Sequence, residues 1–243
     1  MRIEFQNITK KYNKFVALNN ISIQLEGNKS YALLGPNGSG KTTFIKSILG
    51  MVVPGSGNLT VNGENVKHGY QYRKQIGYMP QIGQYPNNMT VKHVFDMMKD
   101  LRNTADYELD EELMDAYQIG TFWNKKTAAL SGGTRQKMSA CLAFLFNPDI
   151  LILDEPTAGL DPLSSEILKE KIIRETQKNK LILITSHILS DLDEIITDVI
   201  YLQDGEILMA DPIHNLRRDT GEKALSKIIA GFIKQHNKVN QHA

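Results

Sequence analysis

The sequence predicts an α/β fold, and three observations carry the prediction. Residues 150–153 and 181–184 are continuous apolar runs, of the kind found in parallel sheets covered on both faces. A helix-patterned segment of residues 164–178 separates them, which is the order of a strand–helix–strand crossover. A glycine-rich loop at residues 35–40 lies between an apolar strand-like run and another helical pattern. We therefore expect an α/β core.

The first elements of the chain are alternating strands. Residues 3–8 and 21–25 alternate apolar and polar side chains at the strand period, and a turn-rich stretch at residues 10–14 separates them. Residues 58–63 are typical of a short strand that ends in Asn-Gly, and residues 75–79 of a further strand. A half-exposed antiparallel sheet is expected to begin the fold.

Helical periodicity replaces the strand period in the middle of the chain. From about residue 89 to residue 146 apolar side chains recur at helical spacing, with Val91 and Phe95 on one face. Strand patterns resume at residues 150–153, so this block is interpreted as a helical insertion. Residues 235–243 form a polar tail that is expected to fray.

The glycine loop has the spacing of a phosphate cradle. In the pattern G-x-x-x-x-G-K-T, glycines let backbone N–H groups turn toward oxygen anions, and the following helix adds the positive end of its dipole. Lys41 would then reach the β- and γ-phosphates, and Thr42 would bind Mg²⁺. The residues expected to bind the nucleotide here are Gly35, Pro36, Asn37, Gly38, Ser39, Gly40, Lys41, Thr42 and Thr43. The alternative, an ordinary glycine-rich turn, conflicts with the flanking strand and helix patterns.

Two adjacent acids, Asp154 and Glu155, follow the apolar run at residues 150–153. Carboxylates at the end of a buried strand are costly unless they have a partner or a task. In a phosphate-loop protein Asp154 would hold Mg²⁺ through water, and Glu155 would orient and deprotonate the attacking water. The alternative is an acid pair that caps the next helix. A second glycine turn, at residues 130–136, opens a helix and is a second candidate anion site.

Composition limits the surroundings in which the protein works. Its 28 Lys and Arg residues nearly balance its 27 Asp and Glu residues, so no nucleic-acid partner is expected. Cys141, the single cysteine, cannot form an internal disulfide, and the N-terminus lacks the apolar block of a signal peptide. These features favour a reducing cytoplasm. No apolar stretch approaches the length of a transmembrane helix, so another chain would have to span any membrane.

Taken together in this order, the motifs resemble those of the ATPase subunits of ABC transporters over nearly the whole chain. The matching elements are an aromatic before the glycine loop (Tyr12), the Walker A loop (Gly35 to Thr42), a strand-ending glutamine (Gln81), the LSGGxxQ signature (Leu130 to Gln136), Walker B (Ile150 to Glu155), a D-loop ending in Asp161 and a switch histidine (His187). The resemblance implies a P-loop NTPase core of the RecA-like type, with an N-terminal antiparallel β subdomain and an inserted α-helical subdomain.

The same resemblance divides the chain into four parts. Residues 1–81 would hold the antiparallel β subdomain and the first part of the ATP-binding core, and residues 82–147 the helical subdomain with the signature. Residues 148–212 would complete the ATP-binding core. Residues 213–243 would form a C-terminal helix and a polar tail.

The family also implies a role for each motif residue. Tyr12 would stack on adenine, Gln81 would contact Mg²⁺ or water and sense the membrane partner, and His187 would contact the γ-phosphate. The implied catalytic set is Glu155, His187 and Gln81, and the implied magnesium set is Thr42, Gln81 and, through water, Asp154. The implied contacts to the ATP of a partner chain are Ser131, Gly132, Gly133 and Gln136, and Asp161 would bridge the two chains.

The resemblance implies ATP and Mg²⁺ as cofactors, a homodimer formed on ATP binding, and a separate transmembrane permease at the cytoplasmic face of a membrane. Apolar side chains after Gln81 favour that permease, because family members receive a coupling helix in a groove there. The residues concerned are Ile82, Tyr85, Pro86, Met89, Val91 and Phe95. The alternative is a soluble ABC ATPase without a membrane channel, of the iron–sulfur-assembly type.

Two further similarities concern the direction and context of transport. No large domain follows about residue 212, which resembles exporter ATPases more than sugar-importer ATPases. The stretches from Thr134 to Asp149 and from Ser186 to Glu194 are similar to NosF-type ATPases, which are associated with copper-site maturation of nitrous oxide reductase. No residue identifies a transported substrate, because the substrate pathway would lie in the membrane subunit.

Overall fold

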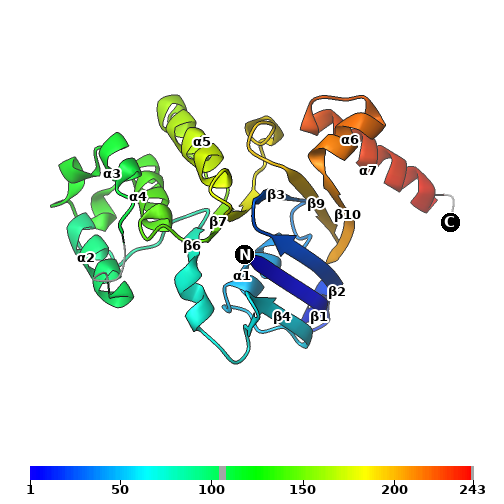
Figure 1. The fold of residues 1–243 in the computed structure, drawn as a ribbon, viewed down its shortest axis with the longest axis horizontal. Helices are drawn as coiled ribbons and strands as arrows, with labels where there is room; N and C mark the ends of the chain where they lie inside the picture. The colour runs from blue at the N-terminus through cyan, green and yellow to red at the C-terminus, as the bar shows by residue number, and fades with distance from the viewer. Residues whose placement is uncertain (104–107, 242–243) are drawn as a thin grey trace.

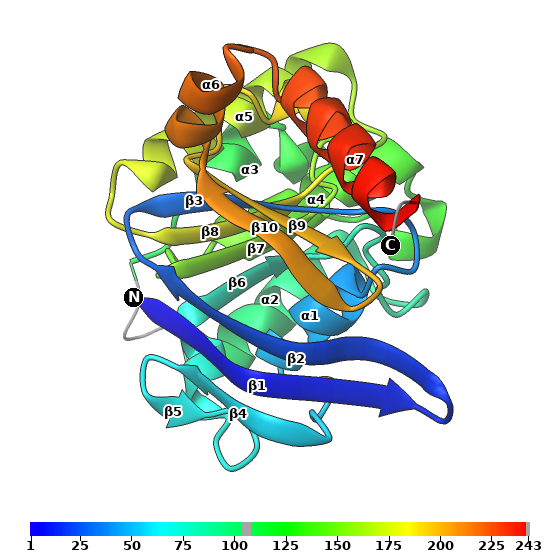
Figure 2. The same ribbon diagram turned by 90° about the vertical axis from the view of Figure 1, so that its right-hand side faces the viewer.

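The computed structural model describes residues 1–103 and 108–241, and two sheets form its centre (Figure 1, Figure 2). The strands are β1 (Arg2–Tyr12), β2 (Phe15–Glu26), β3 (Lys29–Leu34), β4 (Ser56–Val61), β5 (Glu64–Asn65), β6 (Ile76–Met79), β7 (Ile150–Asp154), β8 (Leu181–Thr185), β9 (Asp198–Gln203) and β10 (Glu206–Pro212). The α-helices are α1 (Lys41–Ile48), α2 (Val91–Arg102), α3 (Glu112–Ala116), α4 (Gly132–Phe144), α5 (Pro162–Thr176), α6 (Ile213–Thr220) and α7 (Leu225–Gln241).

The larger sheet has the strand order β10-β9-β3-β8-β7-β6, and the smaller sheet has the order β2-β1-β4-β5. Five strands, β9, β3, β8, β7 and β6, run parallel to one another, and β10 runs antiparallel to β9. Every pairing in the smaller sheet is antiparallel. The predicted α/β core and the predicted antiparallel β subdomain are therefore both confirmed.

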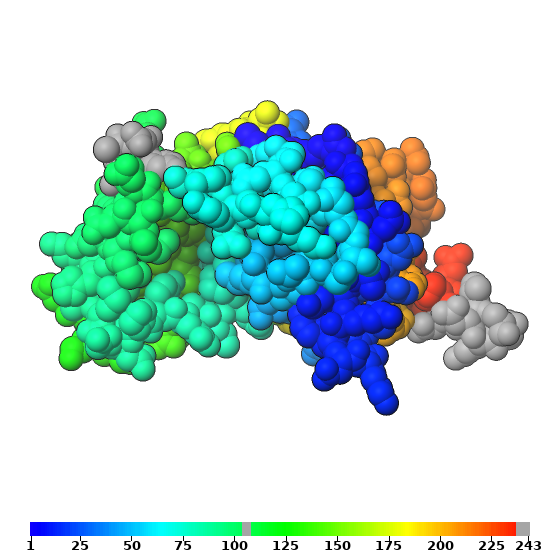
Figure 3. Space-filling model, turned by 90° about the horizontal axis from the view of Figure 1, so that it is seen from below, coloured from blue at the N-terminus to red at the C-terminus, as the bar shows by residue number. Residues whose placement is uncertain are grey.

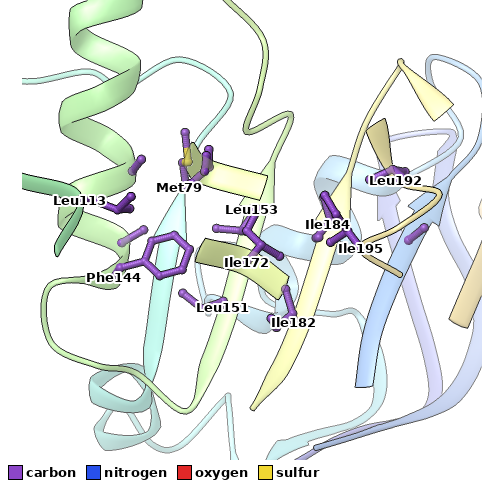
Figure 4. Packing of buried hydrophobic residues seen from close by; sticks show 14 of the residues in the cluster. Met79, Leu113, Phe144, Leu151, Leu153, Ile172, Ile182, Ile184, Leu192 and Ile195 are labelled. Carbon is purple, nitrogen blue, oxygen red and sulfur yellow. The ribbon is translucent and has the colours of Figure 1, made fainter. Parts of the chain in front are cut away.

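Alternate residues of the central strands face two different hydrophobic cores. In β7, Leu151 and Leu153 belong to one core, whereas Ile150 and Ile152 belong to the other. Figure 4 shows the first face, where Leu151 and Leu153 lie near Phe144 of α4 and Ile172 of α5. A sheet covered on both faces needs apolar side chains at every position, which is why these strands are continuous apolar runs.

The second core lies between the two sheets and surrounds α1. Phe5 of β1 stacks on Phe44 of α1, with ring centroids 4.2 Å apart. Figure 2 shows α1 between the smaller sheet and the larger one. This packing fixes the start of α1 at the carboxyl end of β3, which is the edge where open parallel sheets bind ligands.

The helices α2, α3 and α4 gather on one side of the molecule, at the left of Figure 1. Seen from below, they form a lobe beside the residues that follow α1 (Figure 3). The predicted face of α2 is confirmed, because Val91, Val94 and Phe95 are its buried residues. Thr90 caps this helix by accepting a hydrogen bond from the N–H of His93 (3.2 Å). The helical insertion is therefore confirmed, whereas the residue boundaries of the four parts remain a proposal.

Several elements differ from the sequence expectation. The strand β1 continues to Tyr12, so the turn before β2 contains residues 13–14 alone, and register shifts in the pairing of the two strands explain why strict alternation ends early. The edge strand β10 was not predicted, because Met209 is its one buried residue and little alternation results. The helix α7 occupies most of the predicted polar tail and ends at Gln241, and residues 242–243 lie outside the described residues. Within the described part of the chain, no helix is both long and apolar enough to span a bilayer.

Candidate active site

The glycine loop between β3 and α1 has a backbone that depends on two of its glycines. Gly35 has a φ of 147°, and a Cβ added to it would lie 2.0 Å from the carbonyl oxygen of Leu202. Gly40 has a φ of 108°, and its added Cβ would lie 2.3 Å from the carbonyl oxygen of Ala17. Only glycine combines these angles with such close backbone approach. The loop is therefore held against β2 and β9 and curves ahead of α1.

A pocket of about 360 Å³ opens over this loop. Its lining residues are Phe15, Ala17, Asn37, Gly38, Ser39, Gly40, Lys41, Thr42, Thr43, Gln81, Asp154, Glu155 and His187. The strands β3, β8, β7 and β6 are consecutive neighbours in one sheet, and their carboxyl ends bring the glycine loop, His187, Asp154 with Glu155, and Gln81 to one edge. Residues far apart in the sequence thus share a single cavity.

Lys41 is held inside this loop by two backbone carbonyls. Its Nζ donates to the carbonyl oxygen of Gly35 (2.7 Å) and to that of Pro36 (3.0 Å). Burial lowers the pKa of Lys41, while the nearby carboxylates of Glu155 and Asp154 act to raise the pKa. A partly desolvated ammonium group of this kind attracts anions more strongly than one in water.

Ser39 provides a direct sign that the loop is shaped for an anion. Its side chain is buried, and its Oγ has no hydrogen-bond partner among the described residues. Buried hydroxyl groups are normally hydrogen-bonded, so an orphaned one in a binding loop requires an explanation. A phosphate oxygen in the loop would supply the missing acceptor.

The two acids at the end of β7 are fixed by Thr185 at the end of β8. The hydroxyl of Thr185 donates to Asp154 Oδ1 (2.5 Å). The backbone N–H of Glu155 donates to the carbonyl oxygen and to the hydroxyl of Thr185 (3.1 Å each). Glu155 has a φ of 52°, a left-handed conformation that is uncommon outside glycine and is often found at functional sites. Its Oε1 lies 2.8 Å from Nε2 of His187.

The donor set fits a magnesium ion that is shared with a nucleotide. The Thr42 hydroxyl, the Gln81 side chain and the Asp154 carboxylate line the same pocket. Mg²⁺ prefers oxygen ligands, keeps several waters, and is usually held by one or two carboxylates together with substrate phosphates. In the described residues, no group of three or more His, Cys, Asp or Glu side chains could hold a metal alone. The phosphates of a nucleotide would complete the coordination.

Comparison with known proteins identifies the family. The sequence profile of the family described as "ABC transporter" matches residues 18–158. The chain belongs to the ABC transporter family.

Its relatives and structural neighbours agree with this assignment. The chain is 29% identical to "Nod factor export ATP-binding protein I" of Burkholderia lata, over 88% of this chain and 72% of the relative. It is 26% identical to a solved "ATP binding subunit of ABC transporter", with a TM-score of 0.87, over 95% of this chain and 99% of that one. A dimeric ATP-binding cassette in a post-hydrolysis state, bound to ADP and Pi, shares the fold at 22% identity with a TM-score of 0.74, over 87% and 98% of the two chains. The P-loop NTPase fold and the ATPase class of the chain follow.

The signature of this ABC ATPase lies apart from its own glycine loop. Ser131 caps α4, because its Oγ accepts from the N–H of Thr134 (3.2 Å). Ser131 and Gly132 are exposed, Gly133 is half-buried, and no signature residue lines the pocket. One chain therefore does not bring the signature and the Walker A loop into a single site.

Two residues that the ABC resemblance assigns to the nucleotide have surroundings in this chain that bear on those roles, which stay predictions. Gln136 was expected to contact a partner's ATP, but its side chain is buried and its Nε2 donates to the carbonyl oxygen of Glu155 in the same chain (3.4 Å). Tyr12, which the resemblance assigns to adenine, is exposed and lies outside the pocket lining, whereas Phe15 is part of that lining. Tyr12 and Phe15 are paired across the β1–β2 hairpin. An exposed aromatic just after a turn was the available signal for Phe15.

Asp161 forms contacts within its own chain. Its carboxylate accepts from the N–H (2.9 Å) and the hydroxyl (2.7 Å) of Ser164, and thereby caps α5. It also forms an ion pair with Lys137 of the signature helix (2.9 Å). Hydrogen bonds from Lys137 and Ser164 hold the pKa of Asp161 well below its usual range. Asp161 thus joins α5 to α4, and a role between two chains stays a prediction.

Proposed function

We propose that this chain is the ATP-hydrolysing subunit of an ABC transporter, that it uses Mg²⁺, and that it powers a separate membrane subunit. The observation that carries the proposal is the convergence of Lys41, Asp154 and Glu155 in one pocket at the carboxyl edge of the parallel sheet. Cation, metal-binding carboxylate and candidate base are the parts that phosphoryl transfer to water requires.

The residues of the pocket divide the chemistry between them. Backbone N–H groups of the glycine loop and the start of α1 bind the phosphates, and Lys41 exchanges its carbonyl partners for the β- and γ-phosphate oxygens. Thr42 and, through water, Asp154 would hold Mg²⁺, which neutralises charge on those oxygens. Glu155 removes a proton from water as the water oxygen attacks the γ-phosphorus, and the bond to the β-phosphate oxygen breaks to release ADP and phosphate. His187 orients the Glu155 carboxylate through the 2.8 Å contact.

The proposed active form is a homodimer with two shared sites. The signature exposes the N-terminus of α4 on a surface away from its own pocket, so a second copy can bring Ser131 and Gly133 to the γ-phosphate held by Lys41. Support comes from the structural neighbour that was solved as a dimer with ADP and Pi.

The proposed membrane partner would dock near the segment after Gln81. A mainly apolar pocket there includes Tyr85, Pro86, Met97 and Leu142. Phe95 was expected in this groove but is a core residue, because it is buried and packs edge-on against Trp123 (5.2 Å). The export named for the relative from Burkholderia lata supports an exporter, which would place the chain at the cytoplasmic face of a membrane. Copper processing stays a prediction.

ATP turnover by the purified chain tests the enzymatic part of the proposal. Turnover should require Mg²⁺ and stop in excess chelator. Thr42→Ala should raise the Mg²⁺ concentration needed for half-maximal turnover, because a metal-binding hydroxyl is lost. Thr176→Ala is the matched control, since that hydroxyl donates to Ile172 within α5. Equal magnesium dependence in both variants would remove Thr42 from the metal site.

Association with a membrane subunit tests the transporter part against a soluble ATPase. Tyr85→Ala should weaken co-purification with the proposed membrane subunit while ATP turnover of the isolated chain persists. Tyr85 lines the groove, and its hydroxyl hydrogen-bonds Ser139 Oγ (2.7 Å). Ser139→Ala removes the partner of that hydroxyl and serves as the control for local packing. A fully active chain that co-purifies with no permease would favour the soluble alternative.

A further inference from the structure

The loop that carries His187 is fastened to the loop after β7 at both of its ends. At the first end, Thr185 is hydrogen-bonded to Asp154 and Glu155, as described above. At the second end, a short 3-10 turn (Leu189–Asp191) places Asp191 beside Thr157. The hydroxyl of Thr157 donates to Asp191 Oδ2 at 2.9 Å. The two loops therefore meet on either side of the contact between Glu155 and His187.

Asp191 has a second partner in the neighbouring helix. Its Oδ1 lies 3.1 Å from Nζ of Lys169 on α5, so each carboxylate oxygen of Asp191 has a different partner. The side chains of Asp191 and Lys169 are only 20% and 21% exposed, so this contact is better shielded from water than a surface ion pair. Burial opposes the charge of Lys169, but the hydrogen bonds that it donates to the carboxylates of Glu166 and Asp191 raise its pKa. Asp191 thus joins three segments: its own loop, the loop after β7, and α5.

His187 depends on this framework for its position. Its side chain is 55% exposed, so little packing restricts its rotamers, whereas the Glu155 side chain that it meets is only 16% exposed. Within the loop, Ser186 forms a local turn, because its Oγ accepts from the N–H of Ile188 (3.0 Å). The placement of the backbone between Thr185 and Asp191 therefore decides whether Nε2 of His187 reaches Glu155.

We propose that Asp191 is a positioning residue for ATP hydrolysis, which holds His187 against Glu155 by bridging Thr157 and Lys169. The inference rests on the proposed function, in which Glu155 is the base. Loss of the Asp191 bridge leaves the phosphate loop intact, so nucleotide binding is retained while the carboxylate of Glu155 is misoriented. Misplacement of a catalytic group by about 1 Å can lower turnover by roughly 100-fold.

Four variants separate this role from a general effect on stability. Asp191→Asn and Thr157→Val remove the bridge, Thr157→Ser keeps the donating hydroxyl, and Glu166→Gln removes the other partner of Lys169. Glu166 is a matched control, because it also forms an ion pair with Lys169 but its side chain is 64% exposed. Should Asp191→Asn fail to fold, Thr157→Val still tests the bridge, since it changes one hydroxyl into a methyl group.

Two measurements are made on each variant. The first is the NMR spectrum of the ¹⁵N-labelled histidine side chains without nucleotide, with His187 assigned from its loss in His187→Gln. The second is steady-state turnover, resolved into kcat and KM for MgATP. The His187 signals should move in Asp191→Asn and Thr157→Val, and kcat should fall about 10- to 100-fold with KM unchanged. Thr157→Ser and Glu166→Gln should match the wild type in both measurements.

Two outcomes would overturn the inference. One is unmoved His187 signals and an unchanged kcat in both bridge variants. The other is an equal fall of kcat in Glu166→Gln, which would assign the effect to α5 rather than to the bridge. Failure of the proposed function is recognised separately, because a wild-type chain without ATP turnover, or a fully active Glu155→Gln chain, would contradict that function whatever the His187 signals do.

Discussion

Two helix N-termini in this molecule are candidate anion sites, and they are built differently. The helix α1 begins after Gly40, and no side chain caps it by a hydrogen bond. The helix α4 begins after Ser131, whose hydroxyl accepts from the N–H of Thr134. The first N–H groups of a helix lack partners inside it. The start of α1 thus leaves them to a ligand, whereas the start of α4 satisfies one of them internally.

The surroundings of the two helix starts also favour a ligand at α1 more than at α4. Lys41, Asp154 and Glu155 enclose the start of α1 in one pocket. Ser131 and Gly132 at the start of α4 are exposed and outside that pocket. Under the proposed function, one chain holds most of a nucleotide site together with one separate contact at the start of α4. That contact would act on the nucleotide held by a second chain.

The largest expected effects come from the pocket of α1. Glu155→Gln keeps the shape of the side chain but removes the base, so ATP should still bind while turnover falls about 10²- to 10⁴-fold. Lys41→Ala should abolish both ATP binding and turnover, because the cation facing the phosphates is lost. Nucleotide binding and steady-state turnover measured side by side check the difference. Normal turnover in Glu155→Gln would defeat the assignment of the base.

The second prediction tests whether α4 acts on another chain. Ser131→Arg should abolish turnover with little change in ATP binding by the single chain, since Ser131 lies outside the pocket. Mixing the inactive Ser131→Arg and Lys41→Ala chains places both lesions in one site of a mixed dimer and leaves the other site intact. Part of the activity should then return, and turnover of the mixture measures it.

A double variant carrying Ser131→Arg and Lys41→Ala provides the control for that mixture. Mixed with either single variant, it can build no intact site, so no activity should return. If mixed dimers of the two single variants form but stay inactive, either each site is formed by one chain alone or both sites must turn over together. ATP-dependent dimerisation of Glu155→Gln, with a monomer in ADP, distinguishes these two explanations.

The sequence predicts the local motifs far better than the contacts between distant elements. The Walker A spacing and the acids Asp154 and Glu155 are local patterns, because each lies within a few residues and directly follows an apolar run. The contacts of Thr157 with Asp191 and of Lys137 with Asp161 join residues from separate elements. Single polar residues on a helix or loop are common, so their spacing alone cannot indicate which ones meet.

The third prediction concerns the cluster that holds the helical lobe against the core. Lys171 of α5 is buried and contacts Asp110 (2.5 Å) and Glu112 (2.8 Å) of the lobe, as well as Glu175 (3.1 Å). Burial opposes the charge of Glu175, but hydrogen bonds from Lys178, Lys180 and Lys171 outweigh it and lower its pKa from 4.5 to about 2. The cluster therefore helps to hold α3 of the helical lobe against α5.

A lowered carboxylate pKa stabilises the folded chain at neutral pH. The contribution of Glu175 is present above its unfolded pKa and is lost as the pH falls from about 4.5 through about 2. Because the Glu175 side chain is buried, Glu175→Gln should lower the free energy of unfolding at pH 7 by about 3 kcal/mol, and should flatten its fall in acid. Urea unfolding at several pH values measures this. Glu170→Gln on the same helix is the control, since Glu170 is 69% exposed, and an equal effect there would contradict the prediction.

Phe15 lines the pocket of α1 and was not predicted from the sequence. The position of Tyr12 ahead of the glycine loop fits the family pattern. Lys10 Nζ lies over the Tyr12 ring, 5.1 Å from its centroid. The cavity nevertheless includes its hairpin partner Phe15, which is 57% exposed. Which member of a cross-strand pair leans into a cavity depends on the packing of the hairpin against the loop, which alternation does not reveal.

The smallest expected effect distinguishes these two aromatic rings. Stacking of a base on an aromatic ring contributes about 1–3 kcal/mol, and an exposed hairpin ring should lie at the low end. Phe15→Ala should therefore weaken MgATP binding by roughly fivefold, Phe15→Tyr should preserve it, and Tyr12→Ala should leave it unchanged. Because stacking tolerates any base, the loss should be similar for GTP, and equilibrium binding with both nucleotides measures it. The start of α4 has no part in this contact, so dimerisation at saturating ATP should not change. The opposite pattern, with the loss in Tyr12→Ala alone, would support the family assignment of Tyr12 and show that the hairpin turns this ring to the base when nucleotide binds.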